Sequence, residues 1–236
     1  MKEMDLFGVR IHDVTVGEAV ERALADHSPP CTVVTPNALM LGMAKRDASY
    51  KRLLNRATLS LPDGVGVLFA AKRAKTPLRE RSAGIDFGFS LCRTAAQRGL
   101  RVFLLGARPS VAEKAAASLQ KQIESLVICG TYHGYFDQSG SENERVLAAI
   151  RASRADVLFV CFGTPLQEEW VFSNLKELSA LRVIACLGGS LDVWSGSVPR
   201  APRPLRALGL EWAWRTLLSP RRLKSLPLML RGIMRT

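Results

Sequence analysis

The chain has 236 residues, of which 47% are hydrophobic, and a formal net charge of +12. This length suits one sizeable domain or a domain with an appendage, and the apolar content is ample for a buried core, so disorder of the whole chain is excluded. No apolar run approaches the roughly 18 residues of a transmembrane helix, and the start of the chain lacks the apolar region of a signal peptide. We therefore expect a protein that stays in the cytoplasm.

Short apolar runs, many of them β-branched, predict strands at residues 7–11, 31–35, 101–105, 126–129, 157–161 and 182–186. Longer segments with helical periodicity lie between them. Three capping boxes mark helix starts, formed by Thr15 with Glu18, Ser110 with Glu113, and Ser141 with Glu144. This alternation predicts an α/β fold, with a mainly parallel sheet covered by helices on both faces.

The cysteines are scattered singly along the chain, with no C-x-x-C pair: Cys31, Cys92, Cys129, Cys161 and Cys186. An odd number of isolated thiols indicates neither a disulfide framework nor a metal site. Most of them lie in or beside the predicted strands. We therefore expect buried, unpaired thiols.

The composition changes near Val198, which divides the chain into an α/β domain at 1–196 and a basic helical appendage at 197–236. The appendage contains nine Lys and Arg against one acidic residue, Glu211, so it holds eight of the twelve net positive charges. Helical spacing places Leu223, Leu226, Leu230, Ile233 and Met234 on one face and Lys224, Arg231 and Arg235 on another, although Pro227 should kink the helix and Leu228 falls on the wrong side. Such a segment is typical of contact with an anionic bilayer.

Two other interpretations of the appendage stay open. Clustered Lys and Arg are also typical of proteins that bind nucleic acid, although the apolar face favours a membrane and we expect no nucleic acid partner. The segment could also be an ordinary C-terminal helix packed on the domain.

In parallel sheets, ligands bind at the carboxyl ends of the strands, so polar residues just after each strand are the candidates for function. Thr35 and Asn37 follow one predicted strand, and their hydroxyl and amide groups suit sugar hydroxyls or a pyrophosphate. Either side chain could instead simply cap the next helix. Asp63, set between Pro62 and Gly64, is a turn residue or a helix cap in the usual case and a general base in the alternative.

Three further candidates follow along the chain. Arg81 supplies a guanidinium, which is suited to a diphosphate. Gln167 lies in the first turn of a predicted helix and should point toward the strand ends, and Asp192 follows the last predicted strand. Together with Thr35 and Asn37, these residues are the candidates for substrate binding.

The glycine fingerprints of dinucleotide-binding and P-loop proteins do not occur in the sequence. Residues 106–110 lead from a strand into a helix, and they form either a phosphate-binding helix N-terminus or only a tight turn. There is no D-x-D carboxylate pair of the kind that holds a divalent ion on a nucleotide sugar. Neither a metal nor another cofactor is implied, so cationic side chains would have to stabilise a diphosphate leaving group.

Eight motifs, read in order, closely resemble the WecG/TagA/CpsF family of glycosyltransferases. They are Thr35-x-Asn37, Pro62-Asp63-Gly64-x-Gly66, Arg81-x-x-Gly84-x-Asp86, Gly134-Tyr135-Phe136, Gly163-x-Pro165-x-Gln167-Glu168, Gly189-x-x-Asp192, Arg200-Ala201-Pro202 and Gly209-Leu210-Glu211-Trp212. The resemblance spans nearly the whole chain. It implies a Rossmann-like catalytic domain of the GT-E fold with a C-terminal appendage that closes over the active site and joins the membrane.

The resemblance also implies a reaction. An inverting, metal-independent enzyme would move an N-acetylmannosamine-type sugar from a UDP-sugar donor to a polyprenyl-diphosphate-linked N-acetylglucosamine, on the cytoplasmic membrane face, in cell-wall or surface-polysaccharide synthesis. Asp63 matches the proposed base of the family, and Thr35, Asn37, Arg81 and Gln167 match positions of its donor pocket.

Arginines of the appendage are the candidates for the membrane and the acceptor diphosphate. Arg215 and Arg222 match arginines of the family's appendage, and Arg221 is adjacent. The sequence departs from the family at Ser225, where another basic residue can stand. The sequence does not separate N-acetylmannosamine from its uronic acid or another hexose, and a homo-oligomer away from the membrane stays possible. A non-catalytic α/β module that binds membrane or nucleic acid is the alternative, and the missing glycine fingerprint disfavours a nucleotide-dependent oxidoreductase.

Overall fold

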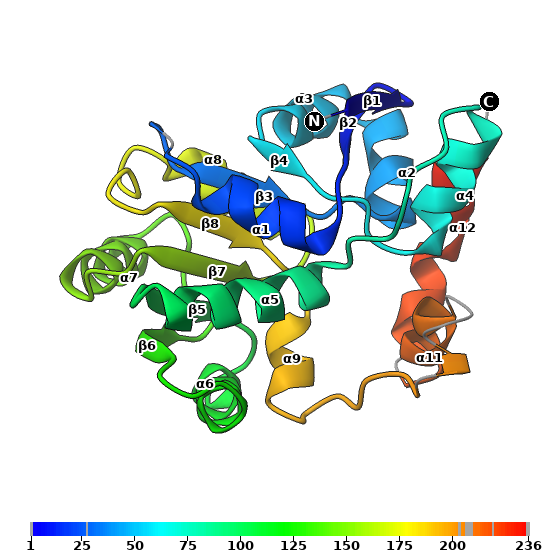
Figure 1. Cartoon of the computed structure of the whole chain (residues 1–236). Coiled ribbons are helices and arrows are strands. Elements are labelled where there is room, and N and C mark those ends of the chain that lie inside the picture. Colours follow the sequence, from blue (N-terminus) through cyan, green and yellow to red (C-terminus); the bar gives the residue numbers. More distant parts are fainter. Residues whose placement is uncertain (1, 27, 203, 206–209, 219, 235–236) are drawn as a thin grey trace.

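The structure is a computed structural model that describes residues 2–26, 28–202, 204–205, 210–218 and 220–234. Within these residues, six parallel strands form the main sheet (Figure 1). In chain order they are β3 (Cys31–Val34), β4 (Leu59–Ser60), β5 (Arg101–Gly106), β6 (Val127–Tyr132), β7 (Val157–Cys161) and β8 (Val183–Cys186). Every residue of β3, β7 and β8 is buried, because helices cover both faces, and this explains why these strands are continuous apolar runs.

The path of the chain across the sheet decides which loops can meet. The strands lie in the order β4-β3-β8-β7-β5-β6, and every neighbouring pair is parallel. From β3 the chain moves outward to β4, crosses over to β5 and β6, and returns through β7 to β8, which pairs with β3. Ligand crevices form outside the carboxyl ends of strands where such a path reverses. The loops after β3, β4, β7 and β8 are therefore neighbours at one edge of the sheet.

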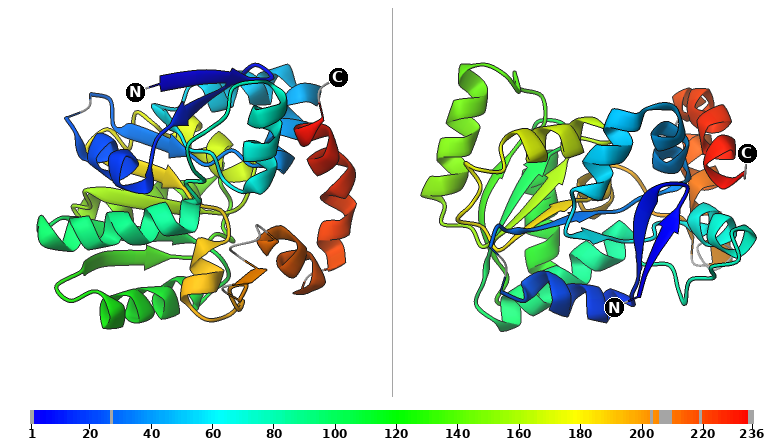
Figure 2. Two further views of the ribbon diagram at one scale, coloured as in Figure 1. Left: turned by 45° about the vertical axis from the view of Figure 1, so that its right-hand side comes forward. Right: turned by 90° about the horizontal axis from the view of Figure 1, so that it is seen from above.

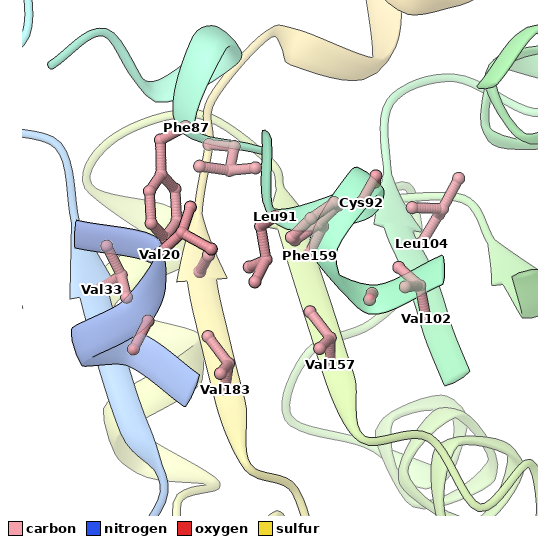
Figure 3. Close-up of a cluster of buried hydrophobic side chains, with 14 of the residues drawn as sticks. Val20, Val33, Phe87, Leu91, Cys92, Val102, Leu104, Val157, Phe159 and Val183 are labelled. Atoms are coloured by element: carbon pink, nitrogen blue, oxygen red, sulfur yellow. The ribbon is translucent and has the colours of Figure 1, made fainter. Parts of the chain in front are cut away.

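Helices cover both faces of the sheet, as the sequence predicts. One face carries α1 (Val16–Leu24), α5 (Gly84–Gln97), α6 (Val111–Gln122) and α9 (Ser190–Trp194), and the other carries α2 (Ala38–Arg46), α3 (Ala48–Asn55), α4 (Val65–Arg73), α7 (Ser141–Ala152) and α8 (Leu166–Ser173). Neighbouring strand residues point to opposite faces, so Ala185 joins the first core cluster and Ile184 the second. Figure 3 shows part of the first cluster, where Phe87 and Leu91 of α5 lie over the strands.

Residues 7–11 were expected to form a strand of the parallel sheet. The structure corrects this expectation, because the strand lies outside that sheet. β1 (Lys2–Leu6) and β2 (Val9–Asp13) form a separate antiparallel hairpin. Phe7 and Gly8 have φ angles of 60° and 84°, which are the positive values that a two-residue hairpin turn requires, and Asp5 Oδ1 accepts a hydrogen bond of 2.8 Å from Gly8 N. The sixth strand of the main sheet is instead β4, whose two residues are too few for a pattern to reveal.

One of the three predicted capping boxes is confirmed. Thr15 Oγ1 accepts from Glu18 N at 3.2 Å, and Glu18 accepts from Thr15 N at 2.9 Å. The other two predictions are wrong. Ser110 has a φ of 68° and makes no side-chain cap, and Ser141 lies inside α7, behind Gly140 at the cap position. A hydroxyl caps a helix only from an extended backbone at the residue just before it.

The five cysteines are free thiols. Four of them are buried, as expected, whereas Cys129 is half-buried. Burial raises the pKa of Cys31, Cys92 and Cys161 to about 12. These thiols are therefore protonated and act as small apolar side chains of the core.

The C-terminal segment docks on the α/β body. It forms α11 (Glu211–Leu218), a 3-10 helix η1 (Pro220–Ser225) and α12 (Leu226–Ile233), and α12 packs on α2 and α4 (Figures 1 and 2). Pro227 does not kink a long helix, because it lies in the first turn of α12, where a missing N–H costs nothing. The backbone carbonyl of Leu228 lies against Gly42 of α2, so this residue, which falls outside the predicted apolar face, is at the docking contact through its backbone. In the part of the chain that the structure describes, no helix is long and apolar enough to cross a membrane.

Candidate active site

The loop after β3 joins that strand to β8. Thr35 is buried, and its hydroxyl donates a 3.2 Å hydrogen bond to the carbonyl of Cys186, the last residue of β8. Gly84 lies directly behind it, because a β-carbon at Gly84 would stand 3.0 Å from Thr35 Cγ2. Asn37 caps α2, and its Oδ1 accepts from the N–H groups of Leu39 and Met40. The capping interpretation of Asn37 is therefore confirmed, and the cap fixes the side chain at the carboxyl edge of the sheet.

Asp63 lies between β4 and α4, half-exposed at the same edge. Its N–H donates to Pro36 O at 2.9 Å, and the carbonyl of Pro62 accepts from Ser82 N at 3.0 Å. These bonds hold the Asp63 loop between the loop after β3 and the segment that leads to α5. Gly64 has a φ of 84°, so glycine is needed there for the chain to turn into α4. The backbone around the carboxylate is thus fixed by neighbours on both sides.

Four charged side chains link the body to the appendage beside this loop. Arg200 Nη2 lies 2.6 Å from Asp86 Oδ1, and its Nε lies 3.6 Å from Glu211 Oε1. Arg81 lies 3.8 Å from Asp86 and 3.7 Å from Glu211, so each arginine faces both carboxylates. Three of these four contacts are too long for hydrogen bonds, and Arg200 Nε has no hydrogen-bond partner among the residues that the structure describes. The two guanidiniums therefore keep donor capacity that an additional anion could use.

Gln167 and Glu168 connect the loop after β7 to the loop after β8. Gln167 is buried in the first turn of α8, where its Oε1 accepts from Gly188 N at 3.0 Å. This contact confirms that Gln167 points toward the strand ends. Its Nε2 donates to Glu168 Oε1 at 2.6 Å, so both ends of the amide are held. The orientation of the Gln167 amide is consequently determined by Glu168 on one side and by the backbone of Gly188 on the other.

Glu168 lies beside Gln167 in the same motif, and the sequence predicts no role for it. Its side chain is 0% exposed and accepts from Thr164 Oγ1 at 2.8 Å and from Tyr50 OH at 3.5 Å. All of its hydrogen-bond donors in the described structure are neutral, so desolvation dominates and raises the pKa of Glu168 to about 7. The sequence gives only a weak indication that this carboxyl is buried. Glu168 directly follows Gln167 in the first turn of a predicted helix, beside the apolar face of that helix.

Asp192 lies in the short helix α9, directly after β8. It is half-exposed, and its carbonyl accepts from Val198 N at 2.9 Å, which begins the turn into the appendage. The Asp192 carboxylate is near enough to Cys161, at the end of β7, to help raise the pKa of that thiol. Asp192 thus lies at the carboxyl edge with Thr35 and Gln167.

The glycine turn at 106–110 packs tightly against β7. A β-carbon at Gly106 would stand 2.5 Å from Cys161 O, and Ala107 N donates to the same carbonyl at 3.1 Å. Close packing of the backbone therefore accounts for the glycine, as the tight-turn interpretation requires. Ser110, in a left-handed conformation, leads into α6.

A pocket of about 720 Å³ lies beside the cluster of four charged side chains described above rather than at the Asp63 loop. It is an open groove between α5, α6 and α9, with Asp86, Phe89, Arg93, Trp194 and Arg200 among its lining residues. Thr35, Asp63 and Gln167 do not line it. The groove therefore shares Asp86 and Arg200 with the group of four charged side chains.

The side chains of Arg215, Arg221 and Arg222 lie outside the described part of the structure, although their backbone belongs to α11 and η1. Ser225 occupies the cap position of α12. Among the described residues, no group of three or more His, Cys, Asp or Glu side chains is arranged to hold a metal ion.

Comparison with known proteins identifies the family of the chain. Residues 4–235 match the Glycosyl transferase WecG/TagA/CpsF family. Over 235 residues the chain is 33% identical to the N-acetylglucosaminyldiphosphoundecaprenol N-acetyl-beta-D-mannosaminyltransferase of Staphylococcus aureus strain MRSA252, with 97% of this chain and 91% of that protein covered. The protein of the same name from strain NCTC 8325 shows the same identity and coverage. With its α/β sheet and its polar groups gathered at the strand ends, the chain belongs to the WecG/TagA/CpsF family of glycosyltransferases.

Proposed function

We propose that the protein transfers an N-acetylmannosamine-type sugar from a UDP-sugar to a polyprenyl-diphosphate-linked N-acetylglucosamine, in the synthesis of a cell-wall or surface polysaccharide. The relatives are named for this acceptor and this sugar, and they align with 97% of the chain. The observation that carries the proposal furthest is the Asp63 loop, which the loops after β3 and before α5 hold at the carboxyl edge of the sheet.

Asp63 would be the general base. Its carboxylate would take the proton of the acceptor hydroxyl as that oxygen attacks the anomeric carbon of the donor. The bond from this carbon to the β-phosphate oxygen would break on the opposite face, and UDP would leave with the electron pair. A single displacement of this kind inverts the anomeric configuration. A positioned base contributes about 100- to 10,000-fold to such a step.

The leaving diphosphate needs positive charge rather than a metal in this proposal. Arg81 would bind the diphosphate, because a guanidinium presents several N–H donors in a plane that matches phosphate oxygens. Thr35, Asn37, Gln167 and Asp192 would line the donor pocket. Their shared place at the strand ends supports this role, as does the rigid hold on the Gln167 amide.

The appendage would bring the enzyme to its lipid substrate. We infer that residues 197–236 associate with the anionic inner face of the cell membrane, and that Arg215, Arg221 and Arg222 contact the membrane or the acceptor diphosphate. The surplus of basic residues supports this inference, because each Lys or Arg near an anionic surface contributes about 1 kcal/mol of attraction.

The test is UDP release with a short-chain polyprenyl-diphosphate N-acetylglucosamine and a panel of UDP-sugars. We expect release with one donor and a fall of about 100-fold or more in kcat for Asp63→Asn, with donor affinity little changed. Asp26→Asn, an exposed carboxylate beyond α1, is the matched control. Near-normal turnover by Asp63→Asn would refute the base assignment, and silence of the folded wild type with every donor would refute the proposed substrates.

A further inference from the structure

The exposed side of α4 carries an unusual combination of side chains. Phe69 is 50% exposed, and the Arg73 guanidinium lies over its ring at 5.8 Å from the centroid. Lys72 and Arg73 are exposed on the same helix, and Lys75 follows it. An exposed phenylalanine flanked by three cations is thus a feature of the α/β body, outside the appendage.

This side of α4 continues onto α12. A β-carbon at Gly66 would stand 3.1 Å from Ile233 Cγ2, so the two helices touch there. Phe69 and Arg73 follow Gly66 by three and seven residues, which places them on the same side of α4. On α12, Leu230 precedes Ile233 by three residues and Met234 follows it, and these side chains are 46% and 50% exposed. Figures 1 and 2 show α4 and α12 side by side.

The charge of this region has one sign. The sequence has no Asp or Glu from Gly64 to Arg79 or from Trp212 to Thr236. The exposed apolar side chains of both helices are therefore interspersed only with cations, including Arg231 on α12. A protein partner of ordinary composition does not require this pattern, whereas an anionic bilayer does, because its headgroups attract cations and its acyl boundary accepts apolar side chains.

We propose that α4 and α12 form one bilayer-contacting surface, made of Phe69, Lys72, Arg73, Leu230, Arg231 and Met234, which we call the α4–α12 surface. The appendage is then not the sole membrane contact, because the catalytic body contributes a helix of its own. This inference rests on the membrane association in the proposed function and adds to it a definite orientation of the body.

The orientation matters because Asp63 comes just before α4. Phe69 follows Asp63 by six positions, and only the four steps from Val65 to Phe69 lie in α4, where each residue rises about 1.5 Å, so the two lie at most about 13 Å apart along the chain. Apolar side chains of an interfacial helix sink roughly 5–10 Å into the headgroup region. With Phe69 seated there, the Asp63 loop is held at the level of the headgroups, where the diphosphate of a polyprenyl acceptor resides. A second contact through α4 restricts the tilt of the body more than a contact through α12 alone.

Other exposed apolar side chains provide the contrast. Tyr135, in the loop after β6, is 69% exposed, yet it lies in a different part of the fold. Scattered exposed apolar residues of this kind are normal and need no partner. Tyr135→Ser is therefore a control for Phe69→Ser, and Arg145→Gln, an exposed cation on α7, is a control for Arg73→Gln.

The experiment is co-sedimentation of the full-length protein with vesicles of phosphatidylcholine, with and without phosphatidylglycerol. Phe69→Ser should weaken partitioning into anionic vesicles by about tenfold or more, because the aromatic side chain that would enter the bilayer is lost. Arg73→Gln should weaken it by about fivefold and reduce the dependence on salt. Thermal unfolding should stay close to wild type in all four variants, and both controls should partition normally.

Each outcome decides between the proposals. Normal partitioning of Phe69→Ser and Arg73→Gln beside a binding wild type would overturn the α4–α12 surface and leave the proposed function intact. A wild type that does not bind anionic vesicles would overturn the membrane association and this surface together. Turnover of a soluble short-chain acceptor would still support the proposed reaction in that case. A dimer in solution that Phe69→Ser dissociates, with vesicle binding unchanged, would assign the surface to a second copy of the chain and so overturn our proposal.

Discussion

Gly42 and Gly232 meet backbone to backbone where α2 and α12 cross. A β-carbon on Gly232 would stand 2.9 Å from Gly42 N, and a β-carbon on Gly42 would overlap the carbonyl of Leu228. Lys45, one turn beyond Gly42, donates to the carbonyls of Arg231 and Met234 at the end of α12. A cation at this helix terminus satisfies carbonyls that have no partner within the helix. The appendage is thus seated on the body by close packing and by a charged cap.

Substitution at this crossing should release the last helix. Gly232→Leu places a side chain into the backbone of α2, which cannot yield, so we expect α12 to detach and trypsin to cut at Lys224 and Arg231 at least tenfold faster. Gly17→Ala is the control, because no described residue lies within 4 Å of the added carbon, and Ala in place of Gly in a helix stabilises by about 1 kcal/mol. Limited proteolysis followed by mass spectrometry measures both. Unchanged cleavage of Gly232→Leu would contradict the docked position of α12.

Arg81 should contribute to donor binding through the shape of its guanidinium. Arg81→Lys keeps the charge but loses the planar fork, so we expect UDP to bind about tenfold more weakly, which corresponds to about 1.4 kcal/mol. Arg98→Lys is the control, since Arg98 pairs at 2.7 Å with Glu21 on the surface of the body, away from the strand ends. Isothermal titration calorimetry with UDP measures both affinities. Equal affinity of Arg81→Lys and wild type would exclude the diphosphate role.

Glu168 should act on catalysis through Gln167. Glu168→Leu removes the acceptor that orients the Gln167 amide, so we expect the donor KM to rise by about tenfold, as for the loss of one charge-assisted hydrogen bond of about 1.5 kcal/mol. In a Gln167→Ala background the same change should leave the donor KM unaltered. This double-mutant cycle separates positioning from a general loss of stability. Additive effects on KM would show that Glu168 does not act through Gln167.

The same carboxyl should give stability a specific dependence on pH. The pKa of Glu168 is about 7 in the folded protein, whereas the ordinary value of 4.5 applies in the unfolded chain. The folded state therefore binds more protons than the unfolded state between these two pH values. Stability must therefore fall as pH rises from 4.5 to 7, by on the order of 3 kcal/mol. Glu168→Gln removes this cost, so its free energy of unfolding should gain on wild type across that range and level off above pH 7. Urea denaturation at several pH values measures the difference, with Glu169→Gln, an exposed neighbour, as the control.

His12 should give a dependence of the opposite sign. It is buried in β2, where Nδ1 accepts from Ser60 N at 2.9 Å and Nε2 lies 3.2 Å from Glu3 Oε1. Burial lowers the pKa of His12 below 6.5, so the unfolded chain binds the proton first as pH falls. Stability should therefore be lost below about pH 6.5, and His12→Asn, which can still accept from Ser60, should lose less. Parallel denaturation curves for His12→Asn and wild type below pH 6.5 would refute the assignment.

Local patterns in the sequence predicted most of the sheet. The strands β3, β5, β7 and β8 are apolar runs because helices bury both of their faces, and this condition is visible residue by residue. The same criterion missed β4, whose two residues gain strand geometry only by pairing with β3. The same criterion also placed residues 7–11 among the parallel strands, because an apolar run does not show which strand it pairs with.

The motifs predicted which residues gather, but not what each one contacts. Thr35 and Gln167 are where the strand-end rule expects them. The pairing of Arg81 with Glu211 joins residues 130 positions apart, and no spacing in the sequence foretells it. The role of Asp63, together with those of the other site residues, stays a prediction for the experiments above.

The sequence by itself determined the α/β class, the helices on both faces and the basic C-terminal segment, because these depend on local periodicity and composition. Only the tertiary structure decided that Leu228 and Gly232 seat α12 on α2, that α4 and α12 expose one apolar and basic side, and that Glu168 is cut off from water. Burial and contact are properties of how distant segments pack. A carboxyl at the start of a helix has the same sequence pattern whether it faces water or Tyr50, and the difference in its pKa arises only when the chain closes around it.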